Sequence, residues 1–223
     1  MARQRSVFDV VGPVMIGPSS SHTAGACRLG ALALAVFAST PIRAHVLLHG
    51  SFAETGLGHG TDLALVAGLL GMRPDDTRIP QAFELADAAG LSVSFAHVDL
   101  GDAHPNTAVI ELQDAEGPVM TVQGCSVGGG DVLVTRIDAF DVEVTGDLPV
   151  LLVAHLDRPG IIAAATGLLA ESGVNIASMQ GSREARGADA LMLIATDLAV
   201  GRATADGIAE LPGVTHVRRM PSV

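Results

Sequence analysis

The chain has few cysteines, few basic residues and no long apolar run. Of its 223 residues only Cys27 and Cys125 carry a thiol, which excludes a disulfide framework and leaves too few thiolates to hold a metal–sulfur cluster alone. Lys and Arg together number 13 against 24 Asp and Glu, a formal net charge of -11. Such a surface repels phosphate backbones and anionic lipids, so no nucleic acid or membrane partner is expected.

No segment reaches the roughly 20 apolar residues that cross a bilayer. The first residues, MARQRSVFDVVGP, include arginines but no long apolar run after them, so we expect no targeting leader and a soluble, cytoplasmic protein. Low-complexity tracts and internal repeats are not visible. The length suits two modest domains, since domains commonly span about 100–150 residues.

The first part of the chain predicts helices and strands in alternation, followed by a run of strands. We expect helices over residues 24–38, 61–71 and 81–90, and strands over 42–48, 91–98, 107–113, 117–124 and 131–137. The second helix should be capped by Thr61 or Asp62 and end at Gly71. Alternating apolar and polar residues in the later strands, separated by Gly, Asp or Pro turns, indicate an antiparallel sheet with one face in solvent. This part is predicted to be an α+β domain with a mixed or antiparallel sheet.

A second pattern begins after the turn cluster VTGDLPV. We expect a strand at 150–155, a helix at 160–172, strands near 174–183 and 188–196, a helix near 203–210 and a strand near 214–219. This βαββαβ order is that of a ferredoxin-like unit. The sequence therefore predicts two domains, residues 1–147 and residues 148–223.

Four hydroxyl side chains and a histidine lie together directly before the first predicted helix: Ser19, Ser20, Ser21, His22 and Thr23. A helix N-terminus exposes unpaired N–H groups and a partial positive charge, so a small loop there binds carboxylate or phosphate. The alternative is that one hydroxyl caps the helix and the others are solvated. The histidine favours a site, because it titrates near neutral pH and a helix N-terminus favours its neutral, proton-accepting form.

Three further polar segments follow in the sequence. The stretch GSFAETGLGHGTD predicts a glycine-rich loop that carries His59 and runs into a helix at Thr61. The stretch DAHPNTA places His104 and Asn106 around a proline, and QGCSVGGG fits a loop or a hairpin with a bulge. Each segment alone is a weak signal, since loop histidines more often serve structure than catalysis. Together, four Gly- and hydroxyl-rich segments at element ends predict one site.

The segments VGPVMIGPSSSHTAGACRLG, HGSFAETGLGHGTDLALVAGLLG, HPNTA and SVGGG, in this order within residues 6–147, resemble the beta chain of bacterial iron-sulfur-dependent L-serine dehydratase. The resemblance implies a domain of the substrate-binding type, like one in some phosphoglycerate dehydrogenases. It also implies a lyase subunit, inactive alone, in an enzyme that converts L-serine to pyruvate and ammonia. In that family a cysteine-rich alpha chain holds a 4Fe-4S cluster, which acts as a Lewis acid on the substrate hydroxyl. The cysteine count of this chain agrees with that division.

The stretch LLVAHLDRPGIIAAATGLLAESGVNIASMQGSREARGADALMLIATD is similar to an ACT domain. Pro159 pre-sets the first helical turn, Gly160 lets a ligand approach the strand–helix loop, and Asn175 is expected to begin the next strand facing that loop. ACT domains usually pair edge to edge and bind amino acids at the pairing surface. The resemblance therefore implies a homodimer through this domain and an amino-acid site that involves Asp157, Gly160 and Asn175. The alternative is that this domain only dimerises.

The implied reaction asks for particular residue types. Dehydration of serine removes the α-proton and expels the β-hydroxyl, a poor leaving group that needs a metal or an acid. We expect His22 to be the base or the anchor of the substrate carboxylate, with Ser20, Ser21 and Thr23 as hydrogen-bond donors. Substrate binding, support of the first loop or contact with the alpha chain is expected of five others: Ser19, His59, Thr61, His104 and Asn106. No metal ligand is expected in this chain.

Two other functions stay open at this stage. One is a non-catalytic, amino-acid-sensing regulatory protein, which serine turnover with a cysteine-rich partner would exclude. The other is a metal-dependent hydrolase with His22, His59 and His104 as ligands. It is disfavoured because these histidines lack the short helical spacing of common metal sites.

Overall fold

The structure, a computed structural model, describes residues 13–223, which divide into two compact units. The first unit holds residues 13–138 and 143–145, and the second holds 139–142 and 146–223. The start of the resemblance at residues 6–12 and the expectation of no targeting leader lie outside the described residues. Within residues 13–223, no helix has the length and apolar character of a membrane span.

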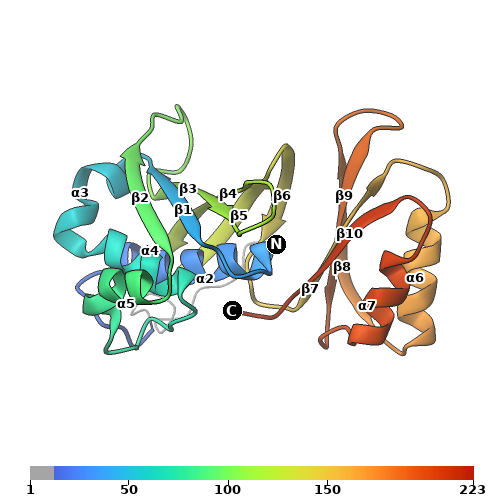
Figure 1. The fold of residues 1–223 in the computed structure, drawn as a ribbon, viewed down its shortest axis with the longest axis horizontal. Coiled ribbons are helices and arrows are strands. Elements are labelled where there is room, and N and C mark those ends of the chain that lie inside the picture. The colour runs from blue at the N-terminus through green and yellow to red at the C-terminus, as the bar shows by residue number, and fades with distance from the viewer. Residues whose placement is uncertain (1–12) are drawn as a thin grey trace. The chain divides into compact units, whose positions relative to one another are not determined.

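The larger sheet has six strands (Figure 1). They are β1 (Arg43–Leu48), β2 (Ser92–His97), β3 (Thr107–Gln113), β4 (Met120–Gly128), β5 (Asp131–Ile137) and β6 (Phe140–Val144). Their order is β2-β1-β3-β4-β5-β6, with β1 and β2 parallel and the pairs β1–β3, β3–β4 and β4–β5 antiparallel. The predicted α+β class with a mixed sheet is confirmed, although β6 was not predicted.

The helices of the first unit pack closely where two glycines meet. They are η1 (Ser20–Gly25), α2 (Ala26–Phe37), α3 (Ser51–His59), α4 (Thr61–Leu69), η2 (Ile79–Gln81) and α5 (Ala82–Ala88). A methyl group on Gly68 of α4 would overlap the Cys27 carbonyl oxygen and lie 2.7 Å from the Ala31 nitrogen of α2. A methyl group on Gly30 would overlap the Leu65 carbonyl oxygen. The two helix backbones therefore touch, which only residues without a side chain allow.

One predicted loop is a helix. The stretch from Ser51 to His59 forms α3, so the prediction of a glycine-rich loop is wrong here. Phe52 is fully buried and holds the helix against the core. The expected cap of α4 is also wrong, because Gly60 precedes it with φ 66° and neither Thr61 nor Asp62 makes a side-chain cap bond.

The polar cluster is part of the first helix rather than a loop before it. Residues from Ser20 form a π-helical turn, η1, which continues directly into α2. The Ser19 carbonyl oxygen accepts from the nitrogens of Thr23 at 2.8 Å and Ala24 at 3.4 Å, the shared bond of a turn widened by one residue. The Ser19 hydroxyl caps this turn by accepting from the backbone nitrogen of His22 at 3.1 Å.

The second unit has the predicted βαββαβ order. Its elements are β7 (Val150–Leu156), α6 (Ile161–Glu171), β8 (Ile176–Arg183), β9 (Asp189–Thr196), α7 (Arg202–Ala209) and β10 (Val214–Met220). The sheet order is β10-β7-β9-β8, all antiparallel, and α6 and α7 cover one face (Figure 1). Leu151 and Ile194 from the strands pack with Leu169 and Ile208 from the helices. The expected ferredoxin-like ACT fold is confirmed.

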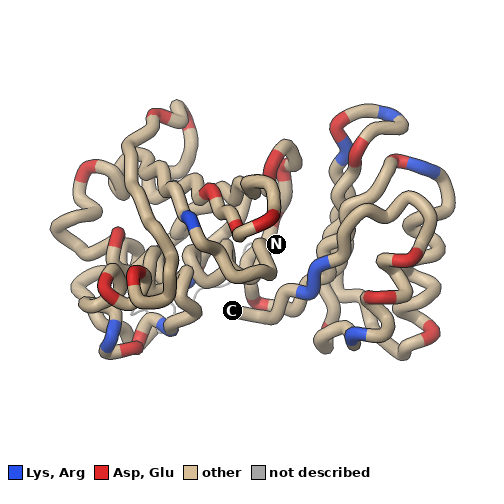
Figure 2. Tube along the Cα trace, in the orientation of Figure 1, with Lys and Arg blue, Asp and Glu red and all other residues tan. Residues whose placement is uncertain are grey.

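Acidic residues are spread over the loops and helices of both units (Figure 2), as the composition predicts. Several arginines are paired with them. Arg28 lies 3.4 Å from Asp131, and Arg183 lies 2.8 Å from Asp157. One partner of each pair is more than half exposed to solvent, so each pair is expected to add at most about 1 kcal/mol to the stability.

Candidate functional site

His22 lies in the π turn, and its ring contacts helix α3. Its Nε2 lies 3.1 Å from the hydroxyl oxygens of both Ser51 and Thr55. The neighbouring Thr23 hydroxyl donates to the His59 carbonyl oxygen at 3.2 Å. Side-chain hydrogen bonds therefore join the first two predicted segments at two places along α3. His22 contacts the first half of the helix, and Thr23 contacts its last residue, His59.

The other two predicted segments complete a ring of contacts. The backbone nitrogen of Phe52 in α3 donates to the Pro105 carbonyl oxygen at 3.3 Å. Asn106 then pairs with Ser126 in β4, accepting from its nitrogen at 3.0 Å and donating from Nδ2 to its carbonyl oxygen at 3.4 Å. Ser126 in turn touches Gly25 of the π turn, where a Cβ would lie 2.8 Å from the Ser126 Cβ. The four segments expected to share a site are neighbours.

The His22 ring is half-buried against two other rings. Its centroid lies 5.3 Å from that of Phe52, edge to face, and 4.9 Å from that of His59. Burial lowers the pKa of His22, a hydrogen bond with the Ser51 backbone opposes this, and the nearby His59 lowers it further. Burial and His59 therefore favour the neutral form of the His22 ring. The main physical cause is burial, rather than the helix terminus.

The hydroxyl groups around His22 divide into two kinds. Those of Ser19 and Thr23 are used within the fold, the first as a cap and the second on the His59 carbonyl. Those of Ser20 and Ser21 are on half-buried residues and make no hydrogen bond within residues 13–223. Only the second kind is free to donate to a ligand.

Two buried hydroxyls near this site have no hydrogen-bond partner among the described residues: those of Thr61 and Ser126. Each unsatisfied group costs about 1–3 kcal/mol, and such groups mark functional or strained places more often than ordinary core. His104 is different, because it is exposed and its contacts form its own turn. Its Nδ1 accepts from the Asn106 nitrogen at 3.1 Å, and its carbonyl oxygen accepts from the Thr107 hydroxyl at 2.6 Å.

Sequence reasoning missed Ser51, Thr55 and Ser126. Ser51 and Thr55 are four residues apart, the spacing that places two side chains on one face of a helix. That signal was hidden because the glycines of the segment favoured a loop. Ser126 lies in the quoted segment QGCSVGGG, but no sequence signal distinguishes it from the glycines beside it.

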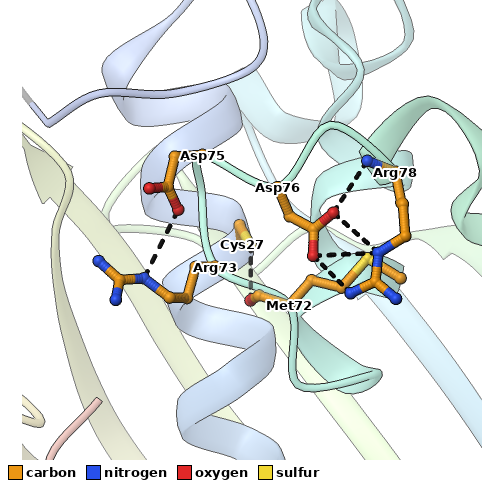
Figure 3. Close-up of polar contacts among 6 residues, drawn as sticks. All are labelled: Cys27, Met72, Arg73, Asp75, Asp76 and Arg78. Atoms are coloured by element: carbon orange, nitrogen blue, oxygen red, sulfur yellow. Dashed lines mark hydrogen bonds and ion pairs between the residues drawn. The ribbon is translucent and has the colours of Figure 1, made fainter.

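The cysteines do not suit an iron-sulfur cluster. Cys27 is buried in α2 and its Sγ donates to the Met72 carbonyl oxygen at 3.3 Å (Figure 3). Burial, with Asp76 and Asp75 nearby, raises the pKa of the Cys27 thiol to about 12, and burial also raises the pKa of Cys125. Cluster ligation needs thiolates, which these environments disfavour. Among the described residues, no group of three or more His, Cys, Asp or Glu is placed to hold a metal ion.

In the second unit, Asp157 is held at the end of β7. Its Oδ2 accepts from Arg183 Nη1 at 2.8 Å and from the Gly187 nitrogen at 3.1 Å. These hydrogen bonds, that of Gly187 first, lower the pKa of Asp157. Gly160 follows in the left-handed region with φ 95° and precedes α6. The predicted strand–helix loop is thus formed as a polar turn.

Asn175 lies at the other end of the same sheet. It precedes β8, whose first residue pairs with Thr196, while the last residue of β8 pairs with Ala190. Because β7 and β8 both pair antiparallel with β9, they run in the same direction, and Asp157 lies at the Ala190 end. The Asn175 side chain donates to Asp197 at 2.7 Å. The prediction that Asn175 faces the Asp157 loop within one chain is wrong.

Comparison with known proteins agrees with this architecture. Residues 6–90 match the profile of the serine dehydratase beta chain, and residues 150–209 match that of the ACT domain. The chain is 41% identical over 218 residues to "Probable L-serine dehydratase, beta chain" of Bacillus subtilis, covering 98% of this chain and 99% of that protein. It is 43% identical over 175 residues to "L-serine dehydratase, beta chain" of Peptoniphilus asaccharolyticus, covering 78% and 79%.

A shorter similarity reaches a different enzyme. Over 85 residues the chain is 31% identical to a D-3-phosphoglycerate dehydrogenase of Methanocaldococcus jannaschii, covering 38% of this chain and 16% of that protein. The two beta chains, by contrast, are matched over most of their length. The chain therefore belongs to the serine dehydratase beta-chain family.

Proposed function

We propose that this chain is the beta subunit of an L-serine dehydratase, a lyase that converts L-serine to pyruvate and ammonia. Its segment from Gly17 to Ala26 forms one wall of an active site completed by an alpha chain. The observation that carries this proposal is a neutral, half-buried His22 beside the uncommitted hydroxyls of Ser20 and Ser21. The similarity to beta chains over nearly the whole sequence supports the same assignment.

The side chains of this segment have two tasks toward serine. A neutral imidazole accepts a proton, so His22 is suited to remove the α-proton; once protonated, it is suited to hold the carboxylate. Ser20 and Ser21 are suited to donate to the carboxylate oxygens, aided by the positive end of the helix that begins at η1. Asn106 and Thr23 hold the surrounding segments in place.

We assign the 4Fe-4S cluster to the cysteine-rich alpha chain. Cys27 and Cys125 do not fit it, since burial keeps both thiols protonated. We place the enzyme in the cytoplasm, where two free, buried thiols stay reduced.

The test is turnover by the assembled alpha–beta enzyme with His22→Ala. Loss of a group that transfers a proton should lower kcat by roughly 100-fold or more, whereas loss of a carboxylate anchor should mainly raise KM. His216→Ala is the matched control, because His216 is an exposed histidine on β10 of the second unit. A His22→Ala enzyme that assembles and retains the wild-type kcat and KM would refute the proposed active site.

For the second unit we propose pairing of two copies through β8. This strand is an outer strand of its sheet and is exposed along most of its length, and free edges tend to pair. Two-fold antiparallel pairing of β8 brings Asn175 of a second copy to the end of the sheet where Asp157 and Gly160 lie. An amino acid is the proposed ligand there.

A chain that binds amino acids but gives no serine turnover with any cysteine-rich partner would favour the non-catalytic sensor instead.

A further inference from the structure

Thr55 is the residue that contacts both histidines of the site. It lies on α3, one turn after Ser51. Its hydroxyl oxygen is 3.1 Å from His22 Nε2, and its carbonyl oxygen is 2.9 Å from His59 Nδ1. No feature of the sequence had singled it out.

The single hydroxyl proton of Thr55 has its shortest contact with a carbonyl oxygen. The hydroxyl donates to the Ser51 carbonyl oxygen at 2.9 Å, and a carbonyl oxygen can only accept. When the Thr55 hydroxyl donates to that carbonyl, its oxygen accepts from His22, and the hydrogen of that contact is on Nε2. The Ser51 hydroxyl oxygen, also 3.1 Å from Nε2, can accept from the same hydrogen. An unprotonated Nε2 would instead face a lone pair of Thr55.

The backbone carbonyl group of Thr55 determines the tautomer of His59, which is the reverse of that of His22. Since that carbonyl accepts, Nδ1 of His59 carries a hydrogen, and neutral His59 keeps its lone pair on Nε2. Neutral His22 has the reverse arrangement, with its lone pair on Nδ1. That atom makes no hydrogen bond within residues 13–223.

We propose that Thr55 is a positioning residue of the dehydratase site. By accepting from Nε2–H it holds His22 in one tautomer, so that Nδ1 is the atom that takes the substrate proton or, once protonated, binds the carboxylate. The proposal rests on the proposed role of His22 and adds the identity of the reacting nitrogen. Thr55 itself touches no substrate and acts through the histidine.

The first experiment reads the tautomer directly. Ring-nitrogen NMR of the full chain, above the pH at which His22 titrates, should show His22 with its proton on Nε2, with a His22→Asn variant to assign the signal. Thr55→Val removes the acceptor but keeps the side-chain shape, so the Ser51 hydroxyl can donate to Nε2 and the proton should shift toward Nδ1. Thr55→Ser should restore the wild-type signal.

Thr166→Val is the matched control, because the Thr166 hydroxyl also donates to a carbonyl four residues earlier, that of Ile162, at 2.9 Å. This variant should leave the His22 signal unchanged. A wild-type His22 with its proton on Nδ1, or a Thr55→Val chain with an unaltered tautomer, would overturn the proposal.

The second experiment measures kcat/KM of the assembled enzyme. Thr55→Val should lower it by roughly two- to tenfold, the effect expected for the loss of one hydrogen bond to the ring. Thr55→Ser should recover most of it, and Thr55→Val should add no further loss in the His22→Ala background. Full turnover in a Thr55→Val enzyme whose tautomer has shifted would overturn this proposal alone. Full turnover in His22→Ala would overturn the proposed function as well, while the NMR result would still report the hydrogen bond.

Discussion

The two predicted sites of this chain differ in whether their residues meet within a single copy. In the first unit, segments up to about 100 residues apart in sequence, from Gly25 to Ser126, are joined by direct contacts within one chain. In the second unit, Asp157 and Asn175 are only 18 positions apart but lie at opposite ends of the sheet. Separation in sequence is therefore a poor guide to assembly, and strand direction decides which loops can meet.

The helix packing of the two units differs as well. In the first unit α2 and α4 touch backbone to backbone at Gly30 and Gly68. In the second unit Gly167 of α6 has no described atom within 4 Å of the position its Cβ would take, apart from those of its chain neighbours and of its own helix backbone. The same residue type is thus required for packing in one helix and dispensable in the other.

The largest effect is expected from Gly68→Ala. The added methyl group meets backbone atoms of α2, which cannot move aside as a side chain would, so the free energy of unfolding should fall by about 2–4 kcal/mol. Gly167→Ala should have the opposite sign and stabilise by about 0.5–1 kcal/mol, because alanine favours a helix more than glycine does. Urea unfolding of the full chain measures both. Equal effects at the two positions would refute the contrast in packing.

A second prediction concerns the two-copy site. Asn175→Ala and Asp157→Asn chains should each lose binding of L-serine to the second unit, measured by calorimetry. Equilibrated in equal amounts they should recover about a quarter of the wild-type sites, since half of the dimers are mixed and each holds one intact site. No recovery on mixing, with dimers still present by light scattering, would place both residues in a site within one copy or in none.

The smallest effect is expected from His59→Gln. His59 lowers the pKa of His22, so replacing the His59 ring should raise that pKa, although burial remains the larger cause. If neutral His22 is the base, activity is lost as the pH falls through its pKa. The acidic limb of kcat/KM should therefore move to higher pH in the variant. A limb that stays in place, or moves to lower pH, would contradict the coupling of the two rings.

The second unit could be predicted almost completely from sequence, and the first only in part. Its elements follow turn residues in the sequence, as at Pro159 and Gly160 before α6, so local preference and tertiary structure agree. In α3 they disagree, because burial of Phe52 forms a helix that its glycines disfavour. The π turn at η1 has no sequence signature, since its shared hydrogen bond depends on the final fold.

The residues of the candidate site could likewise be predicted from sequence only in part. His22 could be identified because a histidine among hydroxyls at a helix end is chemically unusual. Ser51 and Thr55 could not, because their importance comes from the ring packed against them rather than from neighbours in sequence. The position of Asn175 could not be judged before the strand order was known.

The π turn also has a consequence for related sequences. A turn of this kind accommodates one residue more than an ordinary α-helical turn. A relative with one residue fewer between Ser19 and Ala26 can keep the same cap and the same helix α2, losing only the bulge. Alignments of such chains should therefore place a single-residue gap within this stretch. The chains that carry the gap should keep helix α2 and lack one side chain of the π turn.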